Sequence, residues 1–323
     1  MTISARSANS GADARIRSLR PPKPLVDTSV AHGTALDDER RPSGIVERAL
    51  TIFLAGAECP FTCSFCDLWK FTTNAPTPAG ALPTQIEKIL IAQPRPVPHR
   101  LKLYNASNFF DRHAVPLEDW PRIAALAAPF TGVTVESHVN TIGPPTLDFS
   151  GQIAGRLEVA VGLETVHPVA AKELNKRLDL SRFDRTAQFL AENDIELRVF
   201  VLLGTPHIPT EESVEWTVRS VRYAAQRGAA VVAIIPVRGG NGELERLRSL
   251  GKFTSPTFGQ IESALDKCLG LTGTVVTMDL WDIDRWAACA TCREARIARL
   301  GRINLTGRAE PRIECGACAS GGV

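Results

Sequence analysis

The sequence has no long apolar run. Its longest apolar stretches, around residues 199–204 and 231–237, have the length of β-strands, whereas a membrane-spanning helix needs about 18–20 apolar residues in succession. The N-terminal region carries Arg6 and Arg15 but not the apolar core of a secretory signal. We therefore expect a cytoplasmic protein without a membrane partner.

A strong net charge is also missing. The 37 basic and 35 acidic residues leave a formal charge of +2, so no overall field attracts nucleic acid. Only eight of the basic residues are Lys and the other 29 are Arg (37 − 8), a bias that we interpret as genome composition. Any contact with nucleic acid therefore has to come from a local patch.

Length and cysteine usage set further bounds. At 323 residues the chain has room for about two domains, although a single α/β barrel commonly takes about 250 residues. The hydrophobic fraction of 44% is sufficient for a sizeable core. Eight cysteines, most of them in clusters and without a secretion signal, indicate metal binding in a reducing compartment rather than disulfides.

Short apolar runs alternate with amphipathic helical segments along the middle of the chain. The runs predict strands at 50–54, 101–104, 133–136, 157–162, 197–203, 231–235 and 274–278. In the first helical segment, Thr84 and Glu87 predict a capping box at the helix start. Apolar runs of this kind, separated by helices, are typical of parallel strands covered on both faces. A partial barrel and a doubly wound sheet share the pattern, and periodicity does not separate them.

Three cysteines follow the first predicted strand closely. They stand at a three-then-two spacing, Cys59-x3-Cys63-x2-Cys66, and Phe65 precedes the last. Three thiols on one loop can hold three corners of an iron–sulfur cube and leave one iron open for a small molecule. A zinc knuckle and unrelated thiols are the alternatives, but structural zinc needs four ligands and the closest histidine is His99.

This cysteine pattern resembles the signature of the radical S-adenosylmethionine (radical SAM) superfamily. The resemblance implies a 4Fe–4S cluster on Cys59, Cys63 and Cys66, with S-adenosylmethionine chelated at the open iron and Phe65 near its adenine. It also implies reductive cleavage of that cofactor to a 5′-deoxyadenosyl radical, which abstracts hydrogen from a substrate, and an electron donor such as flavodoxin or ferredoxin. The fold it implies is a partial (β/α)6-7 TIM-like barrel.

Polar residues at the predicted strand ends are further candidates for cofactor binding. The resemblance places the amino group of S-adenosylmethionine near the segment that contains Asn105 and Ser107, although the usual Gly-Gly-Glu is absent. Glu136 and Glu164 end later strands, where carboxylates can hold ribose hydroxyls. Arg198 and Pro236 are two more candidates for cofactor binding. Four histidines on predicted loops are candidate proton donors: His113, His138, His167 and His207. The alternatives are an Asn/Ser turn, an ion pair between Glu164 and Arg198, and structural histidines.

Four segments, 101–111, 135–138, 157–165 and 174–177, resemble one branch of the superfamily. This branch contains the radical SAM subunit of archaeosine synthase, with elongator-type proteins at a greater distance. In the archaeal enzyme a radical cleaves a lysine adduct on a modified tRNA base. The present chain differs between the thiols and has no recognisable RNA-binding domain, so the substrate does not carry over. A tRNA-modifying enzyme remains one alternative, and a non-catalytic metal- or RNA-binding scaffold is another.

The C-terminal region contains a second cysteine set, Cys289-x2-Cys292 and Cys315-x2-Cys318. Four thiolates suit either structural zinc or an auxiliary 4Fe–4S cluster. Four arginines recur every third residue between the two pairs, at positions 293, 296, 299 and 302. They form either a phosphate-binding stripe or a solvated helix face with ion pairs.

These observations divide the chain into three parts. We expect a flexible tail at 1–45, the barrel at 46–282 and the cysteine-rich extension at 283–323.

Overall fold

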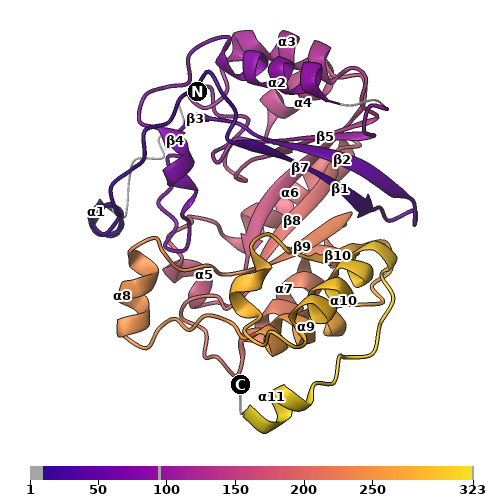
Figure 1. Cartoon of the computed structure of the whole chain (residues 1–323). Coiled ribbons are helices and arrows are strands. Elements are labelled where there is room, and N and C mark those ends of the chain that lie inside the picture. Colours follow the sequence, from indigo (N-terminus) through magenta and orange to yellow (C-terminus); the bar gives the residue numbers. More distant parts are fainter. Residues whose placement is uncertain (1–9, 94–95, 322–323) are drawn as a thin grey trace.

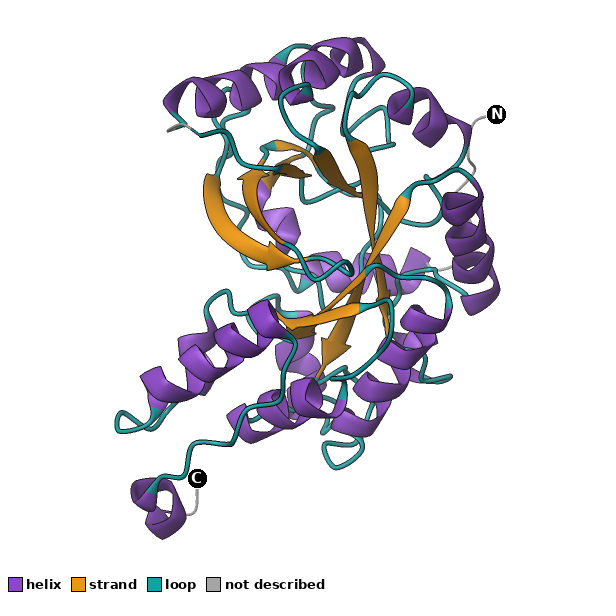
Figure 2. Cartoon of the chain, turned by 90° about the vertical axis from the view of Figure 1, so that its right-hand side faces the viewer, coloured by secondary structure: helices purple, strands orange, loops and turns teal. Residues whose placement is uncertain are grey.

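The computed structural model describes residues 10–93 and 96–321 of the chain. Within these ranges the strands form an eight-stranded sheet that curves into an incomplete barrel, with helices around its outside (Figure 1, Figure 2). Its strands are β1 (Gly33–Arg40), β2 (Val46–Phe53), β5 (Arg100–Tyr104), β6 (Gly132–Glu136), β7 (Arg156–Glu164), β8 (Glu196–Leu203), β9 (Val231–Pro236) and β10 (Val275–Met278). This confirms the predicted α/β class and partial TIM-like barrel.

The order of the strands explains how the barrel is built. From β2 to β10 each strand lies parallel to the next strand along the chain, whereas β1 lies antiparallel to β2. The predicted apolar runs correspond to the parallel strands from β2 to β10. Because parallel neighbours end at the same edge of a sheet, the loops after β2, β5, β7 and β9 gather at one end of the barrel.

Helices cover the outside of the sheet and form the terminal segments. They are α1 (Ser10–Ser18), α2 (Ala81–Ala92), α3 (Trp120–Ala127), α4 (Pro144–Ser150), α5 (Ala170–Glu173), α6 (Leu180–Glu192), α7 (Ser213–Gln226), α8 (Glu243–Ser249), α9 (Phe258–Lys267), α10 (Arg293–Thr306) and α11 (Gly316–Gly321). A small two-stranded sheet, β3 (Gly56–Ala57) with β4 (Thr72–Thr73), brackets the first cysteine loop. None of the helices in the described ranges is long and apolar enough to cross a membrane.

The predicted capping box at Thr84 is wrong, because α2 begins one turn earlier. Its N-cap is Gly80, at a φ of 79° that favours glycine. The backbone N–H of Gly80 donates to Asp119 Oδ1 at 2.7 Å, so a partner distant in sequence fixes the helix start. Thr84 lies inside the helix, where its hydroxyl donates to the Gly80 carbonyl at 2.7 Å.

The prediction of a flexible tail over residues 1–45 is wrong for the part of it that the structure describes. Residues 10–45 contain α1 and β1, and Ile16 of α1 is buried. Strand β1 pairs with β2 along its whole length, from Gly33 opposite Phe53 to Arg40 opposite Val46. The sequence of β1 is highly charged and has no apolar period, so it carries no ordinary strand signal. Residues 1–9 lie outside the described ranges.

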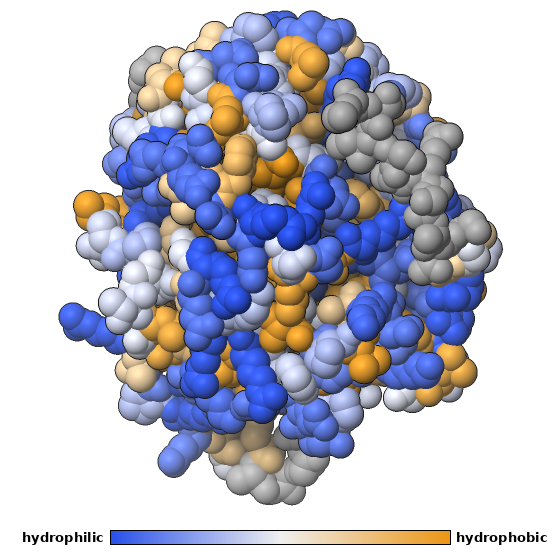
Figure 3. Space-filling model, turned by 180° about the vertical axis from the view of Figure 1, so that it is seen from behind, coloured by the Kyte–Doolittle hydropathy of each residue, from blue (hydrophilic) through white to orange (hydrophobic). Residues whose placement is uncertain are grey.

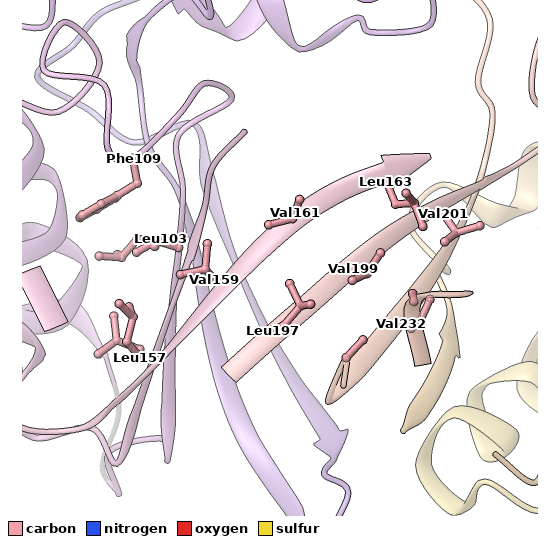
Figure 4. Close-up of a cluster of buried hydrophobic side chains, with 14 of the residues drawn as sticks. Leu103, Phe109, Leu157, Val159, Val161, Leu163, Leu197, Val199, Val201 and Val232 are labelled. Carbon is pink, nitrogen blue, oxygen red and sulfur yellow. The ribbon is translucent and has the colours of Figure 1, made fainter. Parts of the chain in front are cut away.

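The apolar core lies between the sheet and its helices. Strand residues two apart share a face, and Leu157, Val159, Val161 and Leu163 of β7 pack there beside 197–201 of β8 (Figure 4). The alternate positions face the inside of the barrel, which we call the lumen. This alternation corrects the prediction of strands that are apolar on both faces.

The lumen holds a buried network of ion pairs. Glu158 accepts from Arg198 Nε at 2.8 Å and pairs with Arg41 at 2.9 Å. Arg198 also pairs with Glu39 of β1 at 2.8 Å. These cations hold the pKa of the Glu158 carboxyl well below its usual range against the opposing effect of burial. Glu39 of β1, which also pairs with Lys102, thus has its partners inside the barrel. The outer surface, seen from behind, is largely hydrophilic with scattered apolar groups (Figure 3).

Helix α10 lies across the gap between the two end strands of the sheet. It packs against both β1 and β10. Asn304 of α10 pairs with the backbone of β10, because its amide donates to Met278 O at 2.8 Å and its Oδ1 accepts from Met278 N at 2.8 Å. A side chain therefore takes the place that a ninth strand would otherwise occupy at this point of the edge.

Candidate functional site

The first cysteine loop leaves the carboxyl end of β2 and runs between β3 and β4. All three of its cysteines are free and partly buried. Removal from water raises the pKa of each thiol, to about 12 for Cys63. A metal that binds these sulfurs must displace their protons, because the thiolate is the ligand.

Three buried asparagine side chains hold this loop in place. The Asn241 amide donates to Ser64 O at 2.8 Å, and the Asn175 amide donates to Thr62 O at 2.9 Å. The Asn108 amide donates to Cys59 Sγ at 3.3 Å. Sequence analysis missed Asn175 and Asn241 as site residues. Their only signal is an amide in a loop that follows a predicted strand.

Helix α1 and the residues after it also contact the cysteine loop. Asp13 accepts from the Asn175 amide at 2.8 Å and contacts Thr62 and Arg177. Glu58, directly before Cys59, pairs with Arg20 and Lys23 at 2.7 Å each. The segment predicted to be a tail is therefore part of the wall around the loop.

Polar atoms without a partner lie at the end of β5. Asn105 is 1% exposed, and within the described residues neither its amide nitrogen nor its oxygen has a hydrogen-bond partner. The Ser107 hydroxyl likewise has none there. Buried polar groups nearly always have partners. These atoms are therefore suited to a polar ligand.

Glu136, at the end of β6, supports the same segment. Its carboxylate accepts from the backbone N–H of Ala106 at 2.7 Å. Loss of hydration raises the pKa of this carboxyl to about 7, although the backbone donors oppose the rise. Glu136 is therefore partly protonated near neutral pH and positions the loop that carries Asn105.

Glu164 and Lys176 form an ion pair beside the cysteines. Glu164 lies at a bulge after Gly162 with a φ of 65°, and its Oε1 is 2.7 Å from Lys176 Nζ. A Cβ added at Gly162 would fall against the ends of both charged side chains, so a larger residue there would have to displace the ion pair. The Lys176 nitrogen also lies 5.9 Å from the centroid of the Phe65 ring.

Lys176 is the cation whose charge acts on the thiols of the cysteine loop. The Glu164 carboxylate raises the pKa of Lys176 against the opposing effect of burial, so the side chain stays charged. The same ammonium favours the thiolate forms of Cys59 and Cys63. Sequence analysis used residues 174–177 only for the family resemblance and did not identify Lys176 as a site residue.

Pro236 and Arg198, both predicted to bind the cofactor, lie in different parts of the barrel. Pro236 ends β9 opposite Leu203, at the same end of the barrel as the cysteine loop. Arg198 lies near the start of β8, where Glu158 and Glu39 occupy its guanidinium. The structure thus does not bring Arg198 to the cysteine loop, nor into the considered ion pair with Glu164. The cause is the lumen network, which no single strand sequence reveals.

His138 has a structural environment. Its ring stacks on Phe61 of the cysteine loop, with centroids 4.1 Å apart, and its Nε2 lies 3.0 Å from Lys176 O. Burial, reinforced by the Lys176 charge, lowers the pKa of His138 to about 3. The ring is therefore neutral at physiological pH and is not a proton donor there.

The four C-terminal cysteines lie together at a second site. Their sulfur atoms all lie within 4.8 Å of one another. Backbone N–H groups, that of Cys292 first, lower the pKa of Cys289 to about 6.

The arginines of α10 have partners within the chain. Arg296 pairs with Glu262 of α9 at 2.6 Å, and Arg299 pairs with Asp266 of α9 at 2.7 Å. Arg302 pairs with Glu310 at 2.8 Å, and Arg293 donates to Ala287 O at 2.8 Å. The arginine stripe is thus a helix face with internal partners, which removes the argument for phosphate binding.

In its overall fold the chain is similar to radical SAM enzymes. Methylornithine synthase (PylB) superposes with a TM-score of 0.50 at 13% identity, over 69% of this chain and 62% of that one. A shortened Elp3 from the archaeon Methanocaldococcus infernus gives 0.50 at 11% identity, over 82% and 64%. The chain thus spans less than two thirds of these two proteins. No protein-family model matches it, and no curated protein matches its sequence. The likeness therefore establishes the fold.

Proposed function

We propose that this protein is a radical SAM enzyme. Cys59, Cys63 and Cys66 hold a 4Fe–4S cluster, and S-adenosylmethionine binds beside it between the cysteine loop and the end of β5. The observation that carries this proposal is that three free thiols and the unpartnered amide of Asn105 follow neighbouring strands at the carboxyl end of a partial barrel, where Asn108 of the same segment contacts Cys59 Sγ.

The residues at this end of the barrel fit the two cofactors. When bound, the reduced cluster supplies the electron that cleaves S-adenosylmethionine into methionine and a 5′-deoxyadenosyl radical, which takes hydrogen from the substrate. Asn105 and Ser107 offer hydrogen-bonding atoms to the polar groups of S-adenosylmethionine. Lys176 offsets the negative charge of the thiolates, and Glu136 fixes the segment that carries Asn105. Phe65, a residue of the loop whose ring centroid lies 5.9 Å from Lys176 Nζ, offers a surface for the adenine.

The electron must come from outside the chain. A small electron-transfer protein such as flavodoxin or ferredoxin is part of the proposal. The protein's own contribution is to orient the cofactor and to exclude water and oxygen. Helix α1 and the three asparagines help to orient the cofactor because they hold the cysteine loop in place.

The test is anaerobic isolation, reconstitution with iron and sulfide, and measurement of 5′-deoxyadenosine after reduction. The wild type should contain a cluster and release 5′-deoxyadenosine, whereas Cys63→Ala should retain the fold but lose at least 100-fold of that cleavage, on the order expected when a ligand of the reactive centre is removed. Cys268→Ala is the matched control, because this free thiol is buried in the apolar core directly after α9. Equal cleavage by wild type and Cys63→Ala would contradict the proposal.

The two alternatives predict different outcomes. Zinc without iron at the first cysteine loop, together with no binding of S-adenosylmethionine, would favour the non-catalytic scaffold. A tRNA-modifying enzyme would show salt-dependent tRNA binding that weakens in Arg296→Ala. The internal pairing of Arg296 and Arg299 leaves that alternative without a specific observation in its favour.

A further inference from the structure

The second cysteine site has the dimensions of a single metal ion. Cys289 Sγ lies 3.9 Å from Cys315 Sγ, and Cys292 Sγ lies 3.6 Å from Cys318 Sγ. We propose that these four thiolates bind one tetrahedral Zn²⁺ rather than an auxiliary cluster, and that this ion fastens the C-terminal segment across the gap in the barrel. The inference is independent of the proposed function, because it concerns other residues.

The sulfur–sulfur distances separate the two kinds of site. A zinc–sulfur bond of about 2.3 Å places the sulfurs of a tetrahedral site about 3.8 Å apart. In a 4Fe–4S cube each thiolate binds a different iron, so its ligands must stand farther apart than the four sulfurs of one ion. All four sulfurs here lie within 4.8 Å of one another, which leaves room for one ion and not for a cube. The same distances are too long for disulfides, whose S–S bond is about 2.05 Å.

Positive charge accompanies the site. Four thiolates with one Zn²⁺ carry a net charge of about −2. The backbone N–H of Arg296 donates to Cys292 O at 3.0 Å, and its guanidinium pairs with Glu262 at 2.6 Å. It thereby links the metal site to α9 through a charged contact. A residue in this position stabilises the ligand that it touches.

The site closes a segment that is held by polar contacts and buries little apolar surface. Residues 307–314, which we call the strap, are mostly exposed. Arg299 is 1% exposed and donates to the carbonyls of Glu310 and Pro311 at 2.7 and 2.9 Å. Arg312 reaches Asp266 at 3.1 Å. Because the strap buries little apolar surface, the metal must supply much of its anchoring.

The strap joins the metal site to the gap in the barrel. It begins at Gly307, whose φ of 66° ends α10 and whose α-carbon lies against the Arg40 guanidinium of β1. It ends at Cys315 and α11, beyond the barrel (Figure 1). With Cys289 and Cys292 immediately before α10, the ion ties together both ends of the element that spans β1 and β10. The site is therefore a structural clasp.

Elemental analysis of anaerobically purified full-length protein tests the metal. We expect one zinc per chain in the wild type, in Cys63→Ala and in Cys268→Ser, and less than a tenth of that in Cys315→Ser/Cys318→Ser. Replacement of zinc by Co²⁺ should give the intense visible bands of a tetrahedral thiolate site. Four additional irons per chain in place of zinc would overturn the assignment, and so would two disulfides in non-reduced peptide mapping.

Hydrogen exchange tests the clasp. Removal of zinc by a chelator from the wild-type protein should accelerate amide exchange at least tenfold in 300–314, around β10 and along β1, while α2 and α3 stay unchanged. Readdition of zinc alone should restore the slow exchange. Unchanged exchange at β1 and β10 after complete zinc loss would overturn the clasp. Because the chelated wild type needs no substitution, misfolding of a cysteine variant does not affect this test.

Discussion

The Lys176 ammonium lies 2.7 Å from Glu164 Oε1 and 5.9 Å from the Phe65 ring centroid, so one cation joins a strand-end carboxylate to the cysteine loop. The contact depends on the bulge that turns Glu164 and on the absence of a side chain at Gly162. Three segments far apart in sequence thus share one charged group. Its removal has separate effects on stability and on the cluster.

Lys176→Met should destabilise the protein by about 3–5 kcal/mol, because it leaves the Glu164 carboxylate buried without a partner. Lys176→Met/Glu164→Gln should recover most of that loss. In Lys176→Met the reconstituted cluster should have a more negative reduction potential, because the positive charge is missing while the Glu164 carboxylate remains. Potentiometric titration and thermal unfolding measure the two effects. Lys252→Met, at an exposed position, is the control. A potential in Lys176→Met equal to that of the wild type would contradict the role of Lys176.

Glu136 gives a pH dependence of known sign. The native carboxyl keeps its proton up to about pH 7, whereas in the unfolded chain it loses the proton near pH 4.5. The unfolded state is therefore favoured as the pH rises through this window, and the free energy of unfolding should fall by on the order of 3 kcal/mol. Urea unfolding of the cluster-free protein at several pH values measures it. Glu136→Gln should remove this part of the slope, and an unchanged slope would refute the assignment.

The asparagines that hold the cysteine loop should affect cluster retention more than folding. Asn241→Ala removes the donor to Ser64 O and Cys66 O, and it also removes the acceptor of the Leu244 N–H. We expect a loss of about 1–3 kcal/mol in the free energy of unfolding. We also expect the rate of iron loss to a chelator to rise several-fold. Asn193→Ala, at an exposed helix end, is the matched control. Iron loss at the wild-type rate would show that Asn241 does not hold the loop.

Glu158→Gln should be among the most destabilising single substitutions in the chain. Arg41 and Arg198 both pair with this carboxylate and would stay charged and buried. The expected cost is about 3–5 kcal/mol in the free energy of unfolding. Glu211→Gln, on the surface, should stay within about 0.5 kcal/mol of the wild type. Chemical denaturation of both variants measures the difference, and a cost below that of an exposed pair would contradict the lumen network.

The parallel strands were predictable because their apolar positions are local. Each of the seven runs carries enough Val, Leu and Ile to identify itself, and the cysteine spacing selects the barrel over the doubly wound sheet. Strand β1 was not predictable in this way. Its Glu39 pairs with Arg198 and Lys102 on other strands, and these pairs exist only after the barrel closes.

The residues of the candidate site were likewise predictable only in part. The three cysteines were identified from their spacing and Asn105 from the family resemblance, and all four follow strands that end at the same end of the barrel. Lys176, Asn175 and Asn241 were missed because each is an ordinary polar residue in a loop. Their importance comes from contacts over 12 to 177 positions along the chain. Sequence periodicity does not reveal contacts between residues so far apart along the chain.

The pairing of Asn304 with Met278 has a consequence for how the protein behaves in concentrated solution. An uncovered edge strand offers its backbone to other chains and promotes association. Here the amide of Asn304 occupies the backbone groups of Met278, and α10 lies over the edge. A preparation that loses the zinc clasp should therefore become turbid at concentrations at which the intact protein stays clear.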